Sequence, residues 1–299
     1  MTPQRESWRV TAALAALGLA TFAFVTTENI PVGLLPQLAH SLHRSRSATG
    51  YLVTAYALVV VVGSVPLALL TRRFTRKRLL TGALVVFVLG CAAGAAAQTY
   101  GQLLGTRLAI ASGHCVFWAV VAAAGAALVP RDRRGHALAM VFSGSSLASV
   151  VGIPAVTWLG QQTSWRVSTL AASGLGLVSL TAIFVLLPPT VVEEEQQEAP
   201  HPSVRRFTLV QVALALTMTG AFAMLTYITV FLLNLGGFST GAISPILLVS
   251  GAAGAAGVLI SARFVAHHAR PTMTLGVAGL TASLAILALV AHHGTLDVV

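Results

Sequence analysis

The chain has 299 residues, of which 56% are hydrophobic and only 9% are charged. This composition excludes an ordinary soluble domain, because apolar runs of about 18 or more residues recur, and such runs have the length of membrane-spanning helices. The formal net charge of +10 does not indicate nucleic-acid binding, since the basic residues lie in short connections between apolar segments, where they set membrane orientation.

The apolar segments predict an all-α membrane protein with nine spanning helices. Six helices precede a long polar segment and three follow it. The expected bounds are 9–36, 48–70, 79–97, 101–128, 136–160, 166–187, 207–235, 240–263 and 272–291.

Arginine and lysine are distributed unevenly between the two sets of alternate loops. One set carries most of them, whereas the other has only Arg44, Arg46 and Arg166. The positive-inside rule therefore places the N-terminus in the cytoplasm. An odd number of helices then places the C-terminal tail outside the cell.

The first apolar segment contains Glu28, the only carboxylate within any of the long apolar segments. A carboxylate in hydrocarbon is costly and normally faces a bundle interior or a water-filled cavity. Pro31 has no N–H and leaves the carbonyl of Thr27 without its helical partner, so we expect a bend beside the acid. The alternative is that Glu28 lies at the level of the lipid headgroups.

The segment 101–128 carries Arg107, which keeps its charge and must find an anion or carbonyl oxygens. At about 1.5 Å per residue, Arg107 and Glu28 lie at similar depths below the outer surface, which favours their pairing. The alternative is an Arg107 that extends to the outer interface. His114 falls on nearly the same helix face and either lines the same cavity or donates to a backbone carbonyl.

Phe117 and Trp118 follow on the same segment; they either stack on a ring-bearing solute or pack in the core. In the segment 136–160, Ser145, Ser149 and Gly152 form a predicted stripe of small residues that lets another helix approach closely.

The polar segment 188–206 is acidic, contains proline and has no aromatic residue, which favours a flexible linker. The first helix beyond it carries uncharged polar groups that suit hydrogen bonding to a neutral or amphipathic solute, although bonds between helices explain them equally well. They include Thr226, Tyr227 and Asn234. The predicted parts are a six-helix unit over 1–187, a cytoplasmic linker over 188–206 and a partial three-helix unit over 207–299.

Motifs of enzymes and of metal sites are missing from the sequence. It contains no Gly-x-Ser-x-Gly, no His-Glu-x-x-His and no phosphate-binding glycine-rich loop. The adjacent pairs His267-His268 and His292-His293 would point apart on a helix. We therefore expect no enzymatic activity, no metal and no cofactor.

Several stretches together resemble the major facilitator superfamily, and within it the drug:proton antiporters that include sugar-efflux and chloramphenicol-efflux transporters. The resemblance rests on Thr26-Thr27-Glu28-Asn29 with Pro31, on the basic loop 70–80, on Arg107 with His114, Phe117 and Trp118, on Gly152-Ile153-Pro154, and on Trp165-Arg166.

The resemblance implies a major-facilitator-type bundle with a solute site near the membrane midplane. Glu28 would accept the proton, and Arg107 would adjust the proton affinity of Glu28. The solute would contact Thr27, Asn29, His114, Phe117, Trp118, Thr226, Tyr227 and Asn234. Gating and helix packing would involve Arg73, Arg76, Lys77, Gly152 and Pro154. For the basic loop, a solvated segment that only fixes topology is the alternative, since Arg72 stands where the family has aspartate.

The favoured interpretation is a multi-pass protein of the inner (cytoplasmic) membrane that exports a small organic solute, such as a drug or a sugar, in exchange for protons. Two alternatives stay open: a truncated membrane protein that does not transport, and a proton-independent facilitator of the same fold. The dipeptide Arg73-Phe74 recurs as Arg263-Phe264, which indicates an internal repeat whose second copy lacks three helices. Uncovered helix faces would then favour self-association.

Overall fold

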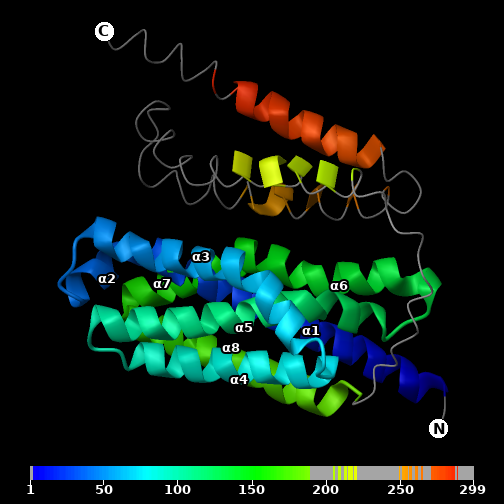
Figure 1. Ribbon diagram of the computed structural model, residues 1–299, viewed down its shortest axis with the longest axis horizontal. Helices are drawn as coiled ribbons and strands as arrows, with labels where there is room; N and C mark the ends of the chain where they lie inside the picture. Colours follow the sequence, from blue (N-terminus) through cyan, green and yellow to red (C-terminus); the bar gives the residue numbers. More distant parts are fainter. Residues whose placement is uncertain are drawn as a thin grey trace. The chain divides into compact units, whose positions relative to one another are not determined.

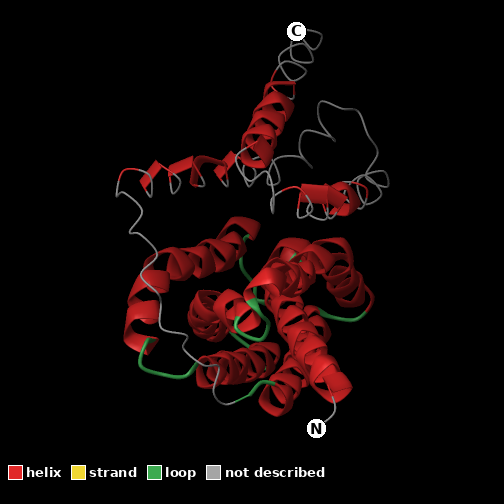
Figure 2. Cartoon of the chain, turned by 90° about the vertical axis from the view of Figure 1, so that its right-hand side faces the viewer, coloured by secondary structure: helices red, strands yellow, loops and turns green. Residues whose placement is uncertain are grey.

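The computed structural model describes residues 3–188 and, beyond them, separate short stretches within 205–288. The chain divides into two compact units, Met1–Val192 and Glu193–Val299. All described elements are helices joined by short loops (Figure 2). The predicted division into two helical units and a cytoplasmic linker stays a prediction.

The first unit is a bundle of helices (Figure 1). In chain order its elements are α1 (Pro3–Gly33), α2 (Leu35–Ser41), α3 (Arg46–Thr71), α4 (Arg76–Ala95), α5 (Tyr100–Ala126), the 3-10 turn η1 (Arg131–Arg133), α6 (Arg134–Leu147), the π-helical turn η2 (Ala148–Gly152), α7 (Ile153–Gln162) and α8 (Trp165–Leu186).

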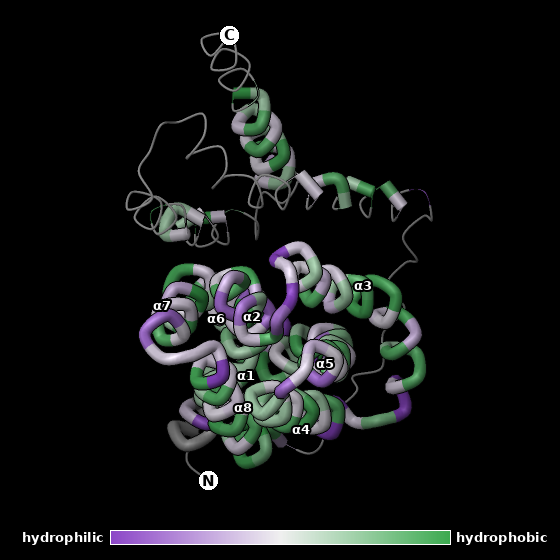
Figure 3. The backbone as a smooth tube through the Cα atoms, turned by 90° about the vertical axis from the view of Figure 1, so that its left-hand side faces the viewer, coloured by the Kyte–Doolittle hydropathy of each residue, from purple (hydrophilic) through white to green (hydrophobic). Residues whose placement is uncertain are grey.

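Six helical stretches among the described residues are long and apolar enough to cross a membrane, and they correspond to the first six predicted helices. They are Trp8–Gly33, Arg46–Thr71, Arg76–Ala95, Tyr100–Ala126, Arg131–Gln162 and Trp165–Leu186. Hydrophilic residues gather in the connections at their ends (Figure 3). The predicted segments 207–235 and 240–263 lie largely outside the described residues, so the total of nine helices stays a prediction.

The sequence sets the starts of three of these helices through their first residues. Ser45 and Ser164 accept a hydrogen bond from the backbone N–H three residues on, at the starts of α3 and α8. Thr99 forms a complete capping box with Gln102 at the start of α5. Such caps satisfy N–H groups that have no partner inside the helix. The first predicted helix ends at Gly33 rather than at residue 36, because a separate short helix with a proline in its first turn follows.

The core of the first unit is aromatic where α1, α4 and α5 meet. Phe24 stacks on Phe117 with 4.5 Å between the ring centres, and its centre lies 4.7 Å from that of Phe87. All three side chains are fully buried. This cluster holds α1 against the two helices that carry the candidate site.

Close packing between α1 and the α6–α7 stretch depends on glycine. A Cβ atom at Gly144 would overlap the carbonyl oxygen of Gly18, and one at Gly152 would overlap the hydroxyl of Thr26. The predicted stripe of Ser145, Ser149 and Gly152 is therefore only partly right. Ser149 is exposed, and the buried positions are Gly144, Ala148 and Gly152, because the π-helical turn changes the register that an α-helix would give.

The basic loop between α3 and α4 binds the ends of two other helices. Lys77 donates from Nζ to the carbonyl oxygen of Leu187 at 2.6 Å, beyond the last turn of α8. Arg76 donates to the carbonyl oxygen of Ala123 near the end of α5, at 3.4 Å. Cations stabilise helix C-termini in this way. Arg73 is exposed to the surroundings of the bundle, and the gating role of all three residues stays a prediction.

The orientation of the chain in the membrane can be tested with reporter fusions after residue 198 and after residue 299. We expect a cytoplasmic reporter at the first position and an external one at the second, because the positive-inside rule places the loops that carry most of the positive charge in the cytoplasm. A fusion after His43, in the loop before α3, is the control and should report the outside. A cytoplasmic signal from the last position would contradict the odd number of spans.

Candidate functional site around Pro31 of α1

The candidate site begins with a gap in the hydrogen bonding of α1. Pro31 lies inside the helix and cannot donate to the carbonyl of Thr27, which it would face in the helical ladder. Glu28 and Asn29 sit between them and are both half-buried. Asn29 donates from Nδ2 to the carbonyl oxygen of Val25 at 2.9 Å, so its amide stays close to its own helix.

Arg107 of α5 supplies donors at this gap. Its Nη1 donates to the carbonyl oxygen of Thr27 and its Nη2 to that of Glu28, each at 2.8 Å. The side chain is only 4% exposed, which excludes the alternative of an arginine that extends to the membrane interface. A buried guanidinium needs several acceptors, and a carbonyl freed by proline is one of the few that a membrane-spanning helix offers.

The structure brings Arg107 and Glu28 together through the backbone rather than through a side-chain ion pair. In the part of the chain that the structure describes, the ion pair is that of Arg133 with Asp132, at 3.9 Å on the surface. The direct pairing of the Arg107 and Glu28 charges expected from depth alone is therefore not formed in this conformation. The guanidinium fork is already occupied by two main-chain oxygens, which leaves the carboxylate as a separate group beside it.

A third helix contacts Arg107 through Tyr56 of α3. The guanidinium carbon lies 4.6 Å from the centre of the Tyr56 ring, a distance at which the ring face attracts a cation. The Tyr56 hydroxyl is 2.7 Å from Nδ1 of His114. The hydrogen-bond partner of His114 is therefore Tyr56. The sequence had suggested either that His114 lines the cavity or that it bonds to a backbone carbonyl. Tyr56, a polar-tipped ring within an apolar helix, was the signal in the sequence that could have indicated this contact.

The two aromatic candidates of α5 have different surroundings. Phe117 is fully buried in the aromatic core, whereas Trp118 is half-buried. The Trp118 ring lies parallel to that of Phe142 with 5.9 Å between their centres. Its Nε1 has no hydrogen-bond partner among the described residues. Of this pair, only Trp118 is partly exposed.

The remaining predicted site residues fall into two groups. Thr27 is buried four residues before Pro31, Gly152 packs in the seam with α1, and Pro154 is exposed on α7. Thr226, Tyr227 and Asn234 lie outside the described residues. The groups that contact Arg107 therefore come from α1 and α3.

Known proteins share the helical architecture described above. A model of the Major Facilitator Superfamily matches residues 17–298. The fold is similar to that of a bacterial homologue of the human lysosomal transporter Spinster, at 15% sequence identity and a TM-score of 0.60. It is also similar to the human organic anion transporter MFSD10, at 16% and 0.62, and to the peptide transporter POT, at 14% and 0.54.

These similarities cover much of this chain but different shares of the other proteins. The match covers 87% of this chain and 62% of the Spinster homologue. The corresponding values are 75% and 50% for POT, and 99% and 86% for MFSD10. Sequence identities this low show only that the folds are similar. The match of the family model extends over nearly the whole chain, and the protein therefore belongs to the Major Facilitator Superfamily.

Proposed function

We propose that this protein transports a small organic solute, such as a drug or a sugar, out across the inner membrane in exchange for protons, with its N-terminus in the cytoplasm. The observation that carries the proposal is a half-buried carboxylate, Glu28, in a stretch of α1 where the buried cation of Arg107 binds the backbone carbonyls of Thr27 and Glu28. Ionisable residues at such depth are costly and commonly mark proton or solute paths.

The hydrogen bonds of Arg107 go to main-chain oxygens, so they do not depend on the charge of Glu28. The carboxylate can therefore gain and lose a proton while these two hydrogen bonds are kept. Burial and the nearby cation act on its charge in opposite senses. An exchanger needs this balance to change as the site opens to each side, so that the acid takes up a proton outside and releases it inside.

Solute contact in the first unit is assigned to Asn29 and Trp118, whose side chains are half-buried. The amide of Asn29 offers donor and acceptor groups, and the Trp118 indole offers a ring face. Both suit a solute that carries a ring and hydroxyl groups. Thr226, Tyr227 and Asn234, which lie outside the described residues, stay predicted solute contacts.

The test compares Glu28→Gln with Glu28→Asp in membrane vesicles that contain the full chain. Ethidium and a radiolabelled methyl galactoside serve as probes, and efflux is measured under an imposed pH gradient. Glu28→Gln should lower gradient-driven transport at least about tenfold, which corresponds to about 1.4 kcal/mol in the barrier, because the amide cannot titrate. Glu28→Asp should keep part of the activity, since it keeps the carboxylate.

Exchange of labelled for unlabelled probe without a pH gradient is the control, and it should persist in Glu28→Gln. Undiminished gradient-driven efflux by this variant would contradict the assignment of Glu28. If a protonophore left wild-type transport unchanged, the facilitator without proton coupling would be the correct alternative.

A further inference from the structure

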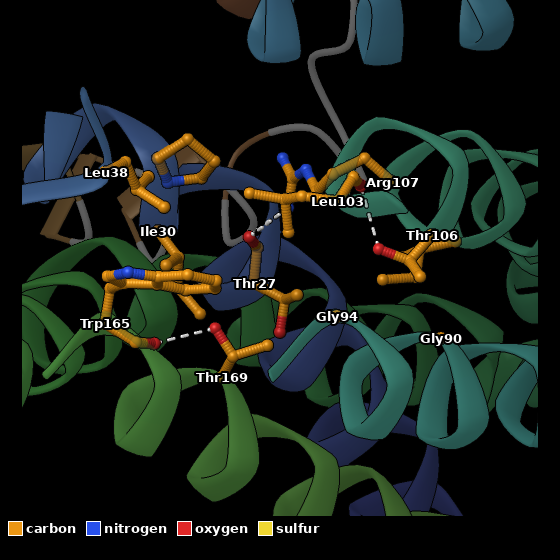
Figure 4. A pocket seen from close by; sticks show the side chains of 12 residues that line it. Thr27, Ile30, Leu38, Gly90, Gly94, Leu103, Thr106, Arg107, Trp165 and Thr169 are labelled. Carbon is orange, nitrogen blue, oxygen red and sulfur yellow. Dashed lines mark hydrogen bonds between the residues drawn. The ribbon is translucent and has the colours of Figure 1, made fainter. Parts of the chain in front are cut away.

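A small cavity lies beside Pro31 of α1, among residues of α1, α2, α4, α5 and α8 (Figure 4). The space open to the centre of a water molecule is about 20 Å³. In this measure a cavity needs only about 10–15 Å³ to hold one water molecule. The lining is largely apolar, but it includes Thr27, Thr106, Arg107 and Thr169.

Two of these groups are buried and lack a hydrogen-bond partner among the described residues: the hydroxyl of Thr27 and Nε of Arg107. The side chains are 1% and 4% exposed. The thiol of Cys91 interacts with the Thr27 hydroxyl, but a thiol is a weak partner. Buried polar groups are rarely left unpaired, and ordered water is the usual partner where the protein supplies none.

The other two polar groups of the lining are hydroxyls that can accept a hydrogen bond from water. Thr106 donates its hydroxyl hydrogen to the carbonyl oxygen of Leu103, and Thr169 donates to that of Trp165, each at 2.8 Å. Both hydroxyl oxygens can then only accept, whereas Nε of Arg107 can only donate. A molecule that donates and accepts fits this set. A cation would be repelled by Arg107, and an anion would face the lone pairs of two threonines.

Trp165 lines this cavity and also a second, open hollow of about 400 Å³ between α2 and the start of α8. The Trp165 side chain is 2% exposed. Its Nε1 donates to Oγ of Ser41 at 2.7 Å, and the Arg166 guanidinium carbon lies 4.4 Å from the centre of its ring. The indole therefore lines both the inner cavity and the open hollow, and it contacts Ser41 and Arg166.

We propose that the cavity beside Pro31 of α1 binds an ordered water molecule, held by the unpaired groups of Thr27 and Arg107, and that Trp165 closes this site from the surface. The water supplies the partner that Nε of Arg107 does not find among the described residues. It also places an exchangeable molecule between the open hollow and Arg107. The inference does not depend on proton coupling, because it concerns hydration of the folded chain.

Radiolytic hydroxyl-radical labelling of the purified chain tests the site, since bound water generates radicals next to buried side chains. Ile110, which lines the cavity and is 2% exposed, should be modified several-fold faster than Ile183, which is 1% exposed and does not line it. Thr27→Val should lower the labelling of Ile110. Thr26→Val is the matched control and should not, because Thr26 is equally buried but lies outside the lining.

The closure is tested by mixing the protein with H2 18O for increasing times before irradiation and measuring how fast 18O appears in the label on Ile110. Trp165→Ala should speed this uptake several-fold, and Ser41→Ala, which only removes the hydrogen bond to the indole, should speed it less. If Trp165→Ala does not fold, Trp165→Phe takes its place. Equal labelling of Ile110 and Ile183 would overturn the water site. Uptake that is unchanged by every variant at positions 165 and 41 would overturn the closure. Loss of Ile110 labelling when chloride replaces gluconate would assign the cavity to an anion instead.

Discussion

Replacing Gly144 by alanine is expected to destabilise the whole first unit. The added Cβ atom would overlap the carbonyl oxygen of Gly18 in α1, and a backbone atom cannot rotate away as a side-chain tip can. Overpacking of a well-packed interior costs about 1–3 kcal/mol, and occasionally more. At about 3 kcal/mol the midpoint of thermal unfolding would fall by roughly 6–12 °C for a unit of this size.

The measurement can use the chain's own thiols. Cys91 and Cys115 are both free and buried, so a dye that becomes fluorescent on reaction with thiols reports unfolding in detergent. Gly174→Ala in α8 is the matched control, because a Cβ atom there meets nothing within 4 Å. That variant should be neutral or gain about 0.5–1 kcal/mol from the better helix former. Equal behaviour of the two variants would contradict the close contact of α1 with α6.

Replacing Arg107 by methionine should stop transport and also weaken the fold. The variant leaves the carbonyl of Thr27 without a donor in the membrane interior, and an unpaired buried polar group costs about 1–3 kcal/mol. Arg107→Lys should not restore the wild type, since an ammonium lacks the planar fork that binds two oxygens at once. Both effects are measured in the vesicle assay and in the thiol-dye unfolding assay.

The proline offers a sharper test of the same contact. Pro31→Ala returns an N–H that can donate to the carbonyl of Thr27, so the pair of variants at positions 31 and 107 forms a double-mutant cycle. Pro31→Ala should recover part of the stability lost in Arg107→Met, with a coupling of about 0.5–3 kcal/mol, while transport stays lost. Strictly additive changes in the free energy of unfolding would show that Arg107 does not serve the gap left by Pro31.

Much of the candidate site follows from single residues and could be predicted from them. Pro31 lacks an N–H, so an unpaired carbonyl at Thr27 follows from covalent structure alone. Arg107 keeps its charge, so a need for anions or carbonyl oxygens follows as well. What could not be predicted is that Arg107 supplies the donor for the carbonyl of Thr27. The predicted depths also allowed an ion pair with the Glu28 carboxylate, and only the packing of α5 on α1 selects the main-chain oxygens.

The sequence by itself determined the class of fold and the six spans of the first unit, because a helix must satisfy its backbone and cover its length in hydrocarbon with apolar residues. Tertiary structure alone decided three further features: the contact of Tyr56 with Arg107 and His114, the π-helical turn that sets which small residues face α1, and the place of Trp165 between two hollows. Each depends on which residues from distant parts of the chain approach one another, and hydrophobic periodicity within one helix carries no information on that.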